Sequence, residues 1–261
     1  MRRWRRRLLV GGLVLAVVLA AGAFALFRYK TDSEVTPVGV DHALADFNAE
    51  VSGGSVASIL AAALPEPGVY TYATSGGDGV DALGGGEHVY PDVTTLTVTA
   101  ASCGVSQLWV AAVERSDEVL TCAVGGGVET VAFTAFHRFF GVDDRESHLC
   151  TGEPRPLRAP AGTTWTTTCV REGETAVWTG EVLEPGRLVV GDEPVDVEHV
   201  VVTIDNGDPD DSQRTETWYR AGTDLVVRRV VDNATVEGSP IGVVHYTEHY
   251  EIALTGLTPA R

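Results

Sequence analysis

The sequence predicts an all-β, mainly antiparallel fold that follows an N-terminal transmembrane helix and a partly helical stalk. From residue 67 onward, runs rich in β-branched and aromatic residues recur, as at 93–99, 128–140 and 195–204. Glycine-rich stretches such as 125–127 separate these runs. Apolar patterns of helical period do not occur among them, so we expect a curved sheet, either a half-barrel or barrel-like.

Residues 8–27 form an apolar run without charged side chains. As a helix with a rise of about 1.5 Å per residue, it would span roughly 30 Å, the thickness of a bilayer's hydrocarbon core. Five arginines lie within residues 1–7, which predicts a cytoplasmic basic tail and an extracytoplasmic location for everything after the helix. The alternative is a cleaved signal peptide, because small residues at 21–25 resemble a peptidase site, and the domain would then be secreted.

A stalk is expected at residues 28–66, between the membrane segment and the β domain at 67–261. Residues 38–51 predict a short amphipathic helix with Asp41 at its start and an apolar face. That face consists of Val40, Leu44, Phe47 and Val51. The following 58–64 stretch is apolar, rich in alanine and ends at prolines. We therefore expect a poorly ordered spacer with one short helix.

The charge balance is strongly acidic, with 19 Lys and Arg against 36 Asp and Glu and a net charge of −17. Such a surface repels nucleic acid and anionic lipid headgroups. We therefore expect no nucleic-acid partner, and contact with the membrane through the N-terminal helix.

Four cysteines, all beyond the membrane segment, predict disulfide bonds in an oxidising compartment. Three connectivities are open, and sequential pairing closes the shortest loops, so we expect Cys103 with Cys122 and Cys150 with Cys169. A zinc site would need closely spaced pairs such as C-x-x-C, which the chain lacks.

The β domain can be divided into halves at 67–150 and 162–257. Residues 68–72 and 162–166 each begin with glycine and continue with threonine and aromatic residues. This weak repeat implies either two similar sheets or one sheet that continues across the proline-rich connector. The second half contains seven predicted strands with short connections, a pattern typical of a meander.

The second half also carries motifs of known families. Residues 215–220 read Thr-Glu-Thr-Trp-Tyr-Arg, residues 222–229 read Gly-Thr-Asp-Leu-Val-Val-Arg-Arg, and a closing strand follows at 246–254. This arrangement resembles the half-barrel of TapB-like and lipoprotein-carrier (LolA-like) proteins, which implies a curved antiparallel sheet around a helix or a hydrophobic ligand. The whole chain is also similar to uncharacterised membrane-anchored proteins of actinobacteria. These are packing motifs, so the resemblance implies architecture and no catalytic residues.

The last strand raises the question of titratable residues. His245 and His249 share one face of a strand but lie too far apart to bind one metal ion, so we expect them to face solvent. Glu248 lies on the opposite, apolar face. It should either lie near a sheet end or pair with an arginine such as Arg228 or Arg229.

No catalytic, metal or cofactor site is predicted. The acidic 205–211 stretch lacks the ligand spacing of an EF-hand and is expected to be a hairpin turn. The chain contains no G-x-S-x-G motif, and its glycine runs lack a following Lys-Ser or Lys-Thr. We therefore predict that the protein is not an enzyme.

Aromatic residues in the predicted strands are candidates for lining a ligand site: Trp165, Trp178, Trp218, Tyr246 and Tyr250. Two hypotheses of function follow. In the first, a noncatalytic extracytoplasmic domain binds an apolar ligand or a protein partner at the cell envelope. In the alternative, the domain has a filled core, binds no ligand and serves as a structural or interaction domain of the envelope. A cavity of some hundreds of Å³ on the concave face would favour the first.

Overall fold

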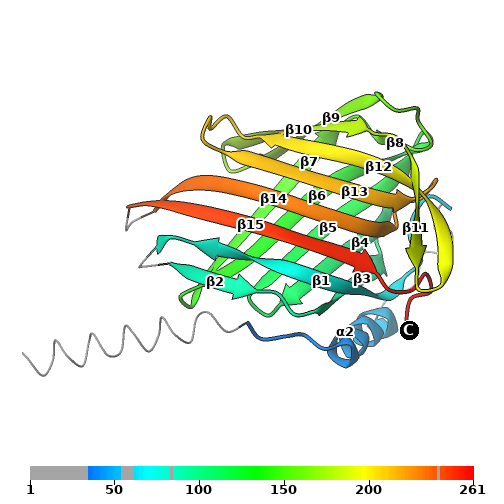
Figure 1. The fold of residues 1–261 in the computed structure, drawn as a ribbon, viewed down its shortest axis with the longest axis horizontal. Coiled ribbons are helices and arrows are strands. Elements are labelled where there is room, and N and C mark those ends of the chain that lie inside the picture. Colours follow the sequence, from blue (N-terminus) through cyan, green and yellow to red (C-terminus); the bar gives the residue numbers. More distant parts are fainter. Residues whose placement is uncertain (1–34, 54–61, 83–84, 240–241) are drawn as a thin grey trace, which may run out of the picture.

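The protein folds into a β-barrel, seen in a computed structural model that describes residues 35–53, 62–82, 85–239 and 242–261. Within these ranges, twelve antiparallel strands close into one sheet (Figure 1), which confirms the predicted all-β antiparallel class. The barrel strands are β1 (Gly68–Val80), β3 (Val93–Ala100), β4 (Gly104–Ala112), β5 (Arg115–Val124), β6 (Gly127–Phe139), β7 (Val142–Gly152), β9 (Thr164–Arg171), β10 (Glu174–Val182), β12 (Glu193–Asp205), β13 (Ser212–Arg220), β14 (Val226–Ser239) and β15 (Gly242–Leu254).

The barrel is fully closed, so of the two expected forms the barrel-like sheet is observed and the half-barrel is not. Each barrel strand pairs with the one before and the one after it, and β15 returns to β1 with Tyr72 opposite Leu254. The ladder between β10 and β12 completes the ring, with Trp178 opposite Ile204. Closure satisfies the backbone groups that an open sheet would leave unpaired at its two edges.

Three short strands attach to the barrel without belonging to the ring. They are β2 (Gly86–Val89), which pairs with β1, β8 (Arg155–Pro156), which pairs with β6, and β11 (Gly186–Val190), which pairs with β12. They anchor the longer connections to the ends of the barrel.

The two predicted halves form one barrel, because β7 pairs with β9 across the proline-rich connector. Sequence patterns did not predict β7. Cys150 lies opposite Cys169 in this ladder, and the two are joined by a disulfide. A second disulfide joins Cys103 to Cys122, so the sequential pairing is confirmed. Of the two arrangements considered, one continuous sheet is the one observed.

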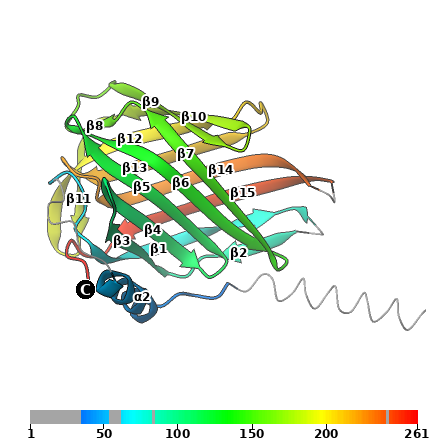
Figure 2. The ribbon, with the colours of Figure 1, turned by 180° about the vertical axis from the view of Figure 1, so that it is seen from behind.

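The two ends of the barrel differ. We call the end with the β3–β4, β5–β6 and β13–β14 turns the packed end, and the other end, with the β4–β5, β6–β7 and β14–β15 turns, the open end. Large side chains fill the packed end, among them Tyr72, Leu96, Trp109 and Leu225. Leu64, from the chain segment before β1, is buried in the same cluster. The packed end lies on the right in Figure 1, and Figure 2 shows the wall of β4–β7 from behind.

The helix α2 (Val40–Gly53) covers nearly the same residues as the helix expected at 38–51. Its Ala43 and Phe47 are buried against Val69 on the outer face of β1. The helix therefore packs on the barrel near the packed end (Figure 1), in contrast to the free spacer expected from the sequence. The apolar face of 38–51 explains this, because it needs a partner surface to leave water.

The first residues that the structure describes, which precede α2, lie at the open end of the barrel. Thr36 accepts a hydrogen bond from Val113 N at 2.9 Å, and its own N–H donates to Glu114 Oε2 at 2.7 Å, both at the β4–β5 turn. The predicted basic tail and transmembrane helix at 1–7 and 8–27 lie outside the described residues, as do residues 58–61 of the apolar stretch. In the ranges that the structure describes, no helix combines the length and apolar character needed to cross a bilayer.

Candidate functional site

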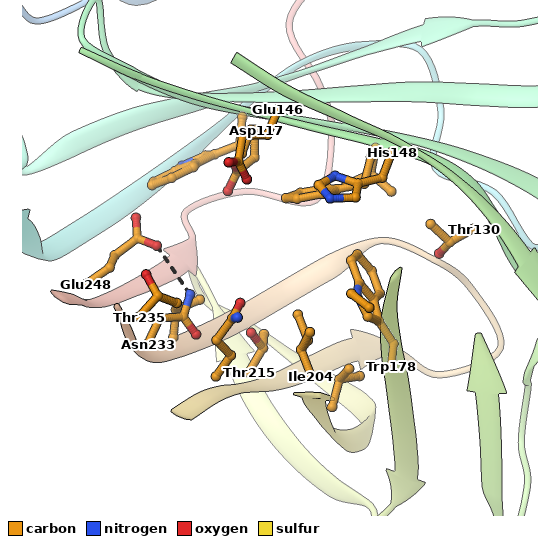
Figure 3. Close-up of a pocket in the computed structure, with 18 of the residues that line it drawn as sticks. Asp117, Thr130, Glu146, His148, Trp178, Ile204, Thr215, Asn233, Thr235 and Glu248 are labelled. Carbon is orange, nitrogen blue, oxygen red and sulfur yellow. Dashed lines mark hydrogen bonds between the residues drawn. The ribbon is translucent and has the colours of Figure 1, made fainter. Parts of the chain in front are cut away.

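A cavity of about 790 Å³ occupies the barrel between the packed end and the open end. Side chains alternate along each strand, so every second residue faces this space. The lining extends from Asp224 near the packed end to Val142 and Asp208 at the open end. Figure 3 shows part of it, with side chains from opposite walls pointing toward one another. The volume lies within the range of about 300–1,000 Å³ typical of small-molecule sites.

The floor of the cavity is a buried ionic cluster. Arg155 Nη2 donates to Asp224 Oδ1 at 2.8 Å, and its Nη1 lies 3.6 Å from Glu198 Oε2. Gln107 donates to the other Asp224 oxygen at 2.7 Å, while the Arg155 guanidinium lies 3.8 Å from the centre of the Tyr219 ring. Burial lowers the pKa of Arg155, but Asp224, Tyr219 and Glu198 together outweigh this effect and the net shift is upward. These contacts close the cavity toward the packed end.

One wall carries a second buried cluster around Arg115, the first residue of β5. Its Nε donates to Glu248 Oε1 at 2.9 Å, and its Nη2 donates to Asp117 Oδ2 at 2.8 Å. Tyr90 Oη donates to Glu248 Oε1 at 2.7 Å, and Asn233 Nδ2 lies 3.5 Å from Glu248 Oε2 (Figure 3). The guanidinium of Arg115 therefore donates hydrogen bonds to two carboxylates, those of Asp117 and Glu248.

Glu248 pairs with an arginine, as expected, but the partner is Arg115 and neither of the two suggested residues, Arg228 and Arg229. Arg228 points to the outer surface and forms an ion pair with Glu251 at 2.7 Å. The actual partner, Arg115, falls in the 114–117 stretch that reads as a turn in the sequence. Because β5 already begins at this residue, its side chain points into the barrel.

A third cluster surrounds Asp78 on β1. His88 Nδ1 lies 2.9 Å from Asp78 Oδ1, His137 Nδ1 lies 3.7 Å from Asp78 Oδ2, and Tyr246 Oη donates to Oδ2 at 3.4 Å. Burial alone raises the pKa of Asp78, but the neighbouring His137 and His88 outweigh it and lower the pKa to about 2. The carboxylate is therefore ionised at neutral pH. His88 also stacks on Phe139 with ring centres 4.4 Å apart.

The opposite wall is more apolar. Phe133 on β6 and Trp178 on β10 meet edge to face, with ring centres 5.4 Å apart, and Val202 and Ile204 on β12 continue this surface. His148 points toward the same space (Figure 3), and burial lowers its pKa, which favours the neutral imidazole. The cavity thus combines an apolar, aromatic area with charged groups on several strands around it.

Four of the five aromatic residues predicted to line a ligand site do line the cavity: Trp165, Trp178, Tyr246 and Tyr250. Trp165 lies directly over Gly180, where a Cβ atom would come within 2.2 Å of the indole ring. Glycine at this position therefore makes room for the tryptophan.

Trp218 does not line the cavity. It lies on the outer face of β13, where its ring stacks on His199 at 4.2 Å and Arg228 lies 4.7 Å from its centre. Its neighbours Thr217 and Tyr219 are the residues that face inward. Because successive side chains of a strand point to opposite faces, an error of one residue in the predicted phase of β13 was enough to assign Trp218 to the wrong face.

The other residues considered from the sequence take structural positions. His245 and His249 are exposed on β15, as expected. Residues 205–211 form the β12–β13 turn, within which Gly207 N donates to Asp205 Oδ1 at 2.8 Å. In the described part of the chain, no three metal-ligating side chains come together as a metal site would require.

Sequence reasoning missed several residues of the cavity, chiefly Arg115, Phe133, His148 and Arg229. A signal for His148 was present, because Asp144, Glu146 and His148 recur at every second position of β7 and all line the cavity. A polar period of two can mark a strand that faces a cavity, just as an apolar one marks a strand that faces a core.

Comparisons with known proteins add little to this description. No protein-family model matches the chain, and no match was found among curated proteins. A solved structure of the hypothetical lipoprotein YmcC from Escherichia coli (K12) is similar at 11% sequence identity and a TM-score of 0.35. The match covers 82% of this chain and 97% of that one. We therefore argue function from the cavity.

Proposed function

We propose that the barrel is a noncatalytic binding domain that holds a small, partly apolar molecule at the cell envelope. The observation that carries this proposal is the cavity of about 790 Å³ inside a closed barrel. A filled core without a ligand, the alternative from the sequence, would lack such a volume. The closed ring keeps the walls in place whether or not the cavity is occupied.

The chemistry of the walls supports a ligand with both apolar and polar parts. Phe133, Trp178 and Ile204 offer apolar and aromatic surface, whereas Asn233 and Thr235 offer hydrogen-bonding groups from β14 (Figure 3). A wholly apolar ligand would desolvate these polar groups without compensation. A wholly polar ligand would gain nothing from the aromatic wall.

The course of the chain supports a location at the membrane. Residue 36 is fixed at the open end through Glu114, so an upstream membrane anchor would hold this end toward the bilayer. Exposed valines surround the same end: Val89, Val113, Val142 and Val243. The two disulfides fit an oxidising, extracytoplasmic compartment.

The interior clusters support a noncatalytic role. The carboxylates of Asp117 and Glu248 both accept hydrogen bonds from Arg115, so this guanidinium occupies oxygens of both groups. A general acid or base would need a carboxyl group free to exchange a proton with a bound molecule, and the hydrogen bonds from Arg115 leave neither of these two carboxylates free for that role.

Photo-crosslinking tests this proposal. The full-length chain, reconstituted in lipid nanodiscs, is irradiated with a photoreactive analogue of hexadecanol, and the labelled peptides are mapped by mass spectrometry. We compare Ile204→Trp, which fills the cavity from β12, with Thr203→Trp, which adds the same ring to the exposed outer face of that strand.

We expect labels on cavity-lining peptides of β6, β10 and β14, at least tenfold weaker in Ile204→Trp and unchanged in Thr203→Trp. Labels confined to outer-surface peptides, or equal labelling of the cavity in both variants, would contradict the proposal.

A further inference from the structure

Arg229 is the basis of a more specific inference about the ligand. It lies on β14 opposite Ile252 of β15, and its side chain lines the deep part of the cavity. Its Nε atom is buried without a hydrogen-bond partner. Across the described ranges, Arg229 makes no ion pair and no hydrogen bond through its guanidinium. Within these ranges it is therefore a partly buried cation without a direct counter-ion.

The other arginines that line the cavity are different. Arg115 contacts Asp117 and Glu248, Arg155 contacts Asp224, and Arg171 contacts Glu146 and Glu174. Each of the three thus has at least one carboxylate in hydrogen-bond contact. Among the described residues, Arg229 is thus the one of these four cavity-lining arginines that has no carboxylate partner.

An unpaired guanidinium whose Nε is buried is costly, because it loses part of its hydration and cannot lose its proton. Asp117 is a charged neighbour, but both of its carboxylate oxygens already accept hydrogen bonds from Arg115. Folding therefore leaves Arg229 with donors that only an additional acceptor could satisfy. The planar guanidinium fork suits a carboxylate or phosphate, which it can bind through two parallel hydrogen bonds.

We propose that Arg229 binds the anionic headgroup of the ligand, and that this ligand is a single-chain amphiphile with one carboxylate. This inference rests on the proposed binding function and adds the class of ligand. The headgroup lies at the bottom of the cavity, and the apolar chain extends along Phe133, Trp178 and Ile204 toward the open end.

The surrounding charges favour a carboxylate over a phosphate monoester. Asp117 and Glu248 lie on the neighbouring wall, and Glu146, Glu174 and Asp208 line the way to the open end. Each of these negative charges repels a dianion about twice as strongly as a monoanion. One unpaired guanidinium matches one negative charge.

Competition against the photoreactive hexadecanol tests the inference in full-length chain held in nanodiscs. The competitors are palmitate, hexadecanol and hexadecyl phosphate, which share one chain and differ in headgroup. Arg229→Met removes the cavity charge and keeps much of the side-chain volume. Arg228→Met is the matched control, because it removes the adjacent arginine, which pairs with Glu251 on the outer surface.

In the unmodified chain we expect palmitate to compete about 10- to 100-fold more strongly than hexadecanol, the range of a charge-assisted hydrogen bond. Arg229→Met should abolish this preference while hexadecanol still binds, which also shows that the variant is folded. Arg228→Met should keep the preference.

Three results would overturn the inference. If hexadecanol competes as well as palmitate and Arg229→Met changes nothing, the binding function stands and the role of Arg229 falls. If hexadecyl phosphate competes more strongly than palmitate, the ligand is not a carboxylate. If none of the three compounds competes, both the ligand class and the binding function are wrong.

Discussion

The packed end and the cavity of the barrel are built from the same strands but use inward-facing residues differently. At the packed end, Trp109 stacks on Tyr250 at 4.6 Å and donates a hydrogen bond to Thr94. In the cavity, Trp178 touches Phe133 by an edge and turns part of its surface to open space. The same contrast separates Arg155, which contacts Asp224, from Arg229. The first set stabilises the fold, whereas the second, on the function proposed above, is available to a ligand.

The largest expected effect comes from breaking the ionic floor. Asp224→Ala would leave Arg155 buried beside Glu198 alone, and we expect a loss of about 3–5 kcal/mol in the free energy of unfolding. Asp196→Ala, which breaks an exposed pair with Arg187, should cost far less, because solvent screens that pair. Guanidinium denaturation followed by tryptophan fluorescence measures both. Equal losses would mean that the floor does not hold the fold.

The two tryptophans provide a second comparison. Trp109→Ala should cost about 3–5 kcal/mol because it opens a void among fully buried side chains. Trp178→Ala should cost about 1 kcal/mol or less, because its side chain is only partly buried, whereas Trp109 is 1% exposed although it too borders the cavity. The same denaturation experiment measures both variants. A larger loss for Trp178 than for Trp109 would reverse the division between the two regions.

The disulfides allow a comparison in which chain entropy is matched. Both join cysteines 19 residues apart, so replacing either pair by alanine should cost about 3 kcal/mol through the unfolded state. Cys150 and Cys169 are both buried, whereas Cys103 is exposed, so the Cys150–Cys169 pair should cost more. Urea denaturation measures the free energy of unfolding of both double variants. The difference between the two values then gives the contribution of packing around the buried disulfide. Equal costs would indicate that burial adds nothing.

A smaller effect is expected from pH at the Asp78 cluster. The pKa of Asp78 falls from an ordinary 3.8 to about 2 in the folded state, so its carboxylate stabilises the fold fully above about pH 4. As the pH falls from about 4 to about 2, about 2 kcal/mol of this stability should be lost. Asp78→Asn should remove this part of the pH dependence. If the variant and the unmodified chain lose stability in parallel over this range, Asp78 is not its source.

Sequence patterns predicted much of the barrel and little of its interior. The apolar alternation of β15 placed Tyr246, Glu248 and Tyr250 on one inward face and His245 on the other, as observed. The pattern failed at β7, whose inward residues are charged or polar because they line a cavity. A rule based on apolar periodicity recognises strands that face a core and overlooks strands that face open volume.

Closure and ion pairing depend on contacts between distant segments, so local patterns could not predict them. The β10–β12 ladder decides between a half-barrel and a ring, yet it depends on where β11 folds away from the wall. The partner of Glu248 is 133 residues away, on a strand whose first residue reads as part of a turn. Of the neighbouring residues Trp218 and Tyr219, only one can face inward, because side chains alternate along a strand. Amino-acid composition alone does not tell which of the two it is.

The meeting of the first and last strands has a consequence for how the chain folds. Val69 and Ala260 exchange two backbone hydrogen bonds of 2.9 Å each, so the beginning and the end of the barrel lie side by side. During folding this seam cannot form until β15 and the residues after it are available, which makes folding dependent on very distant contacts and therefore slow. The same proximity makes the barrel suited to circular permutation. A short peptide could join its two ends, and new termini could be opened at another hairpin, with every ladder of the ring retained.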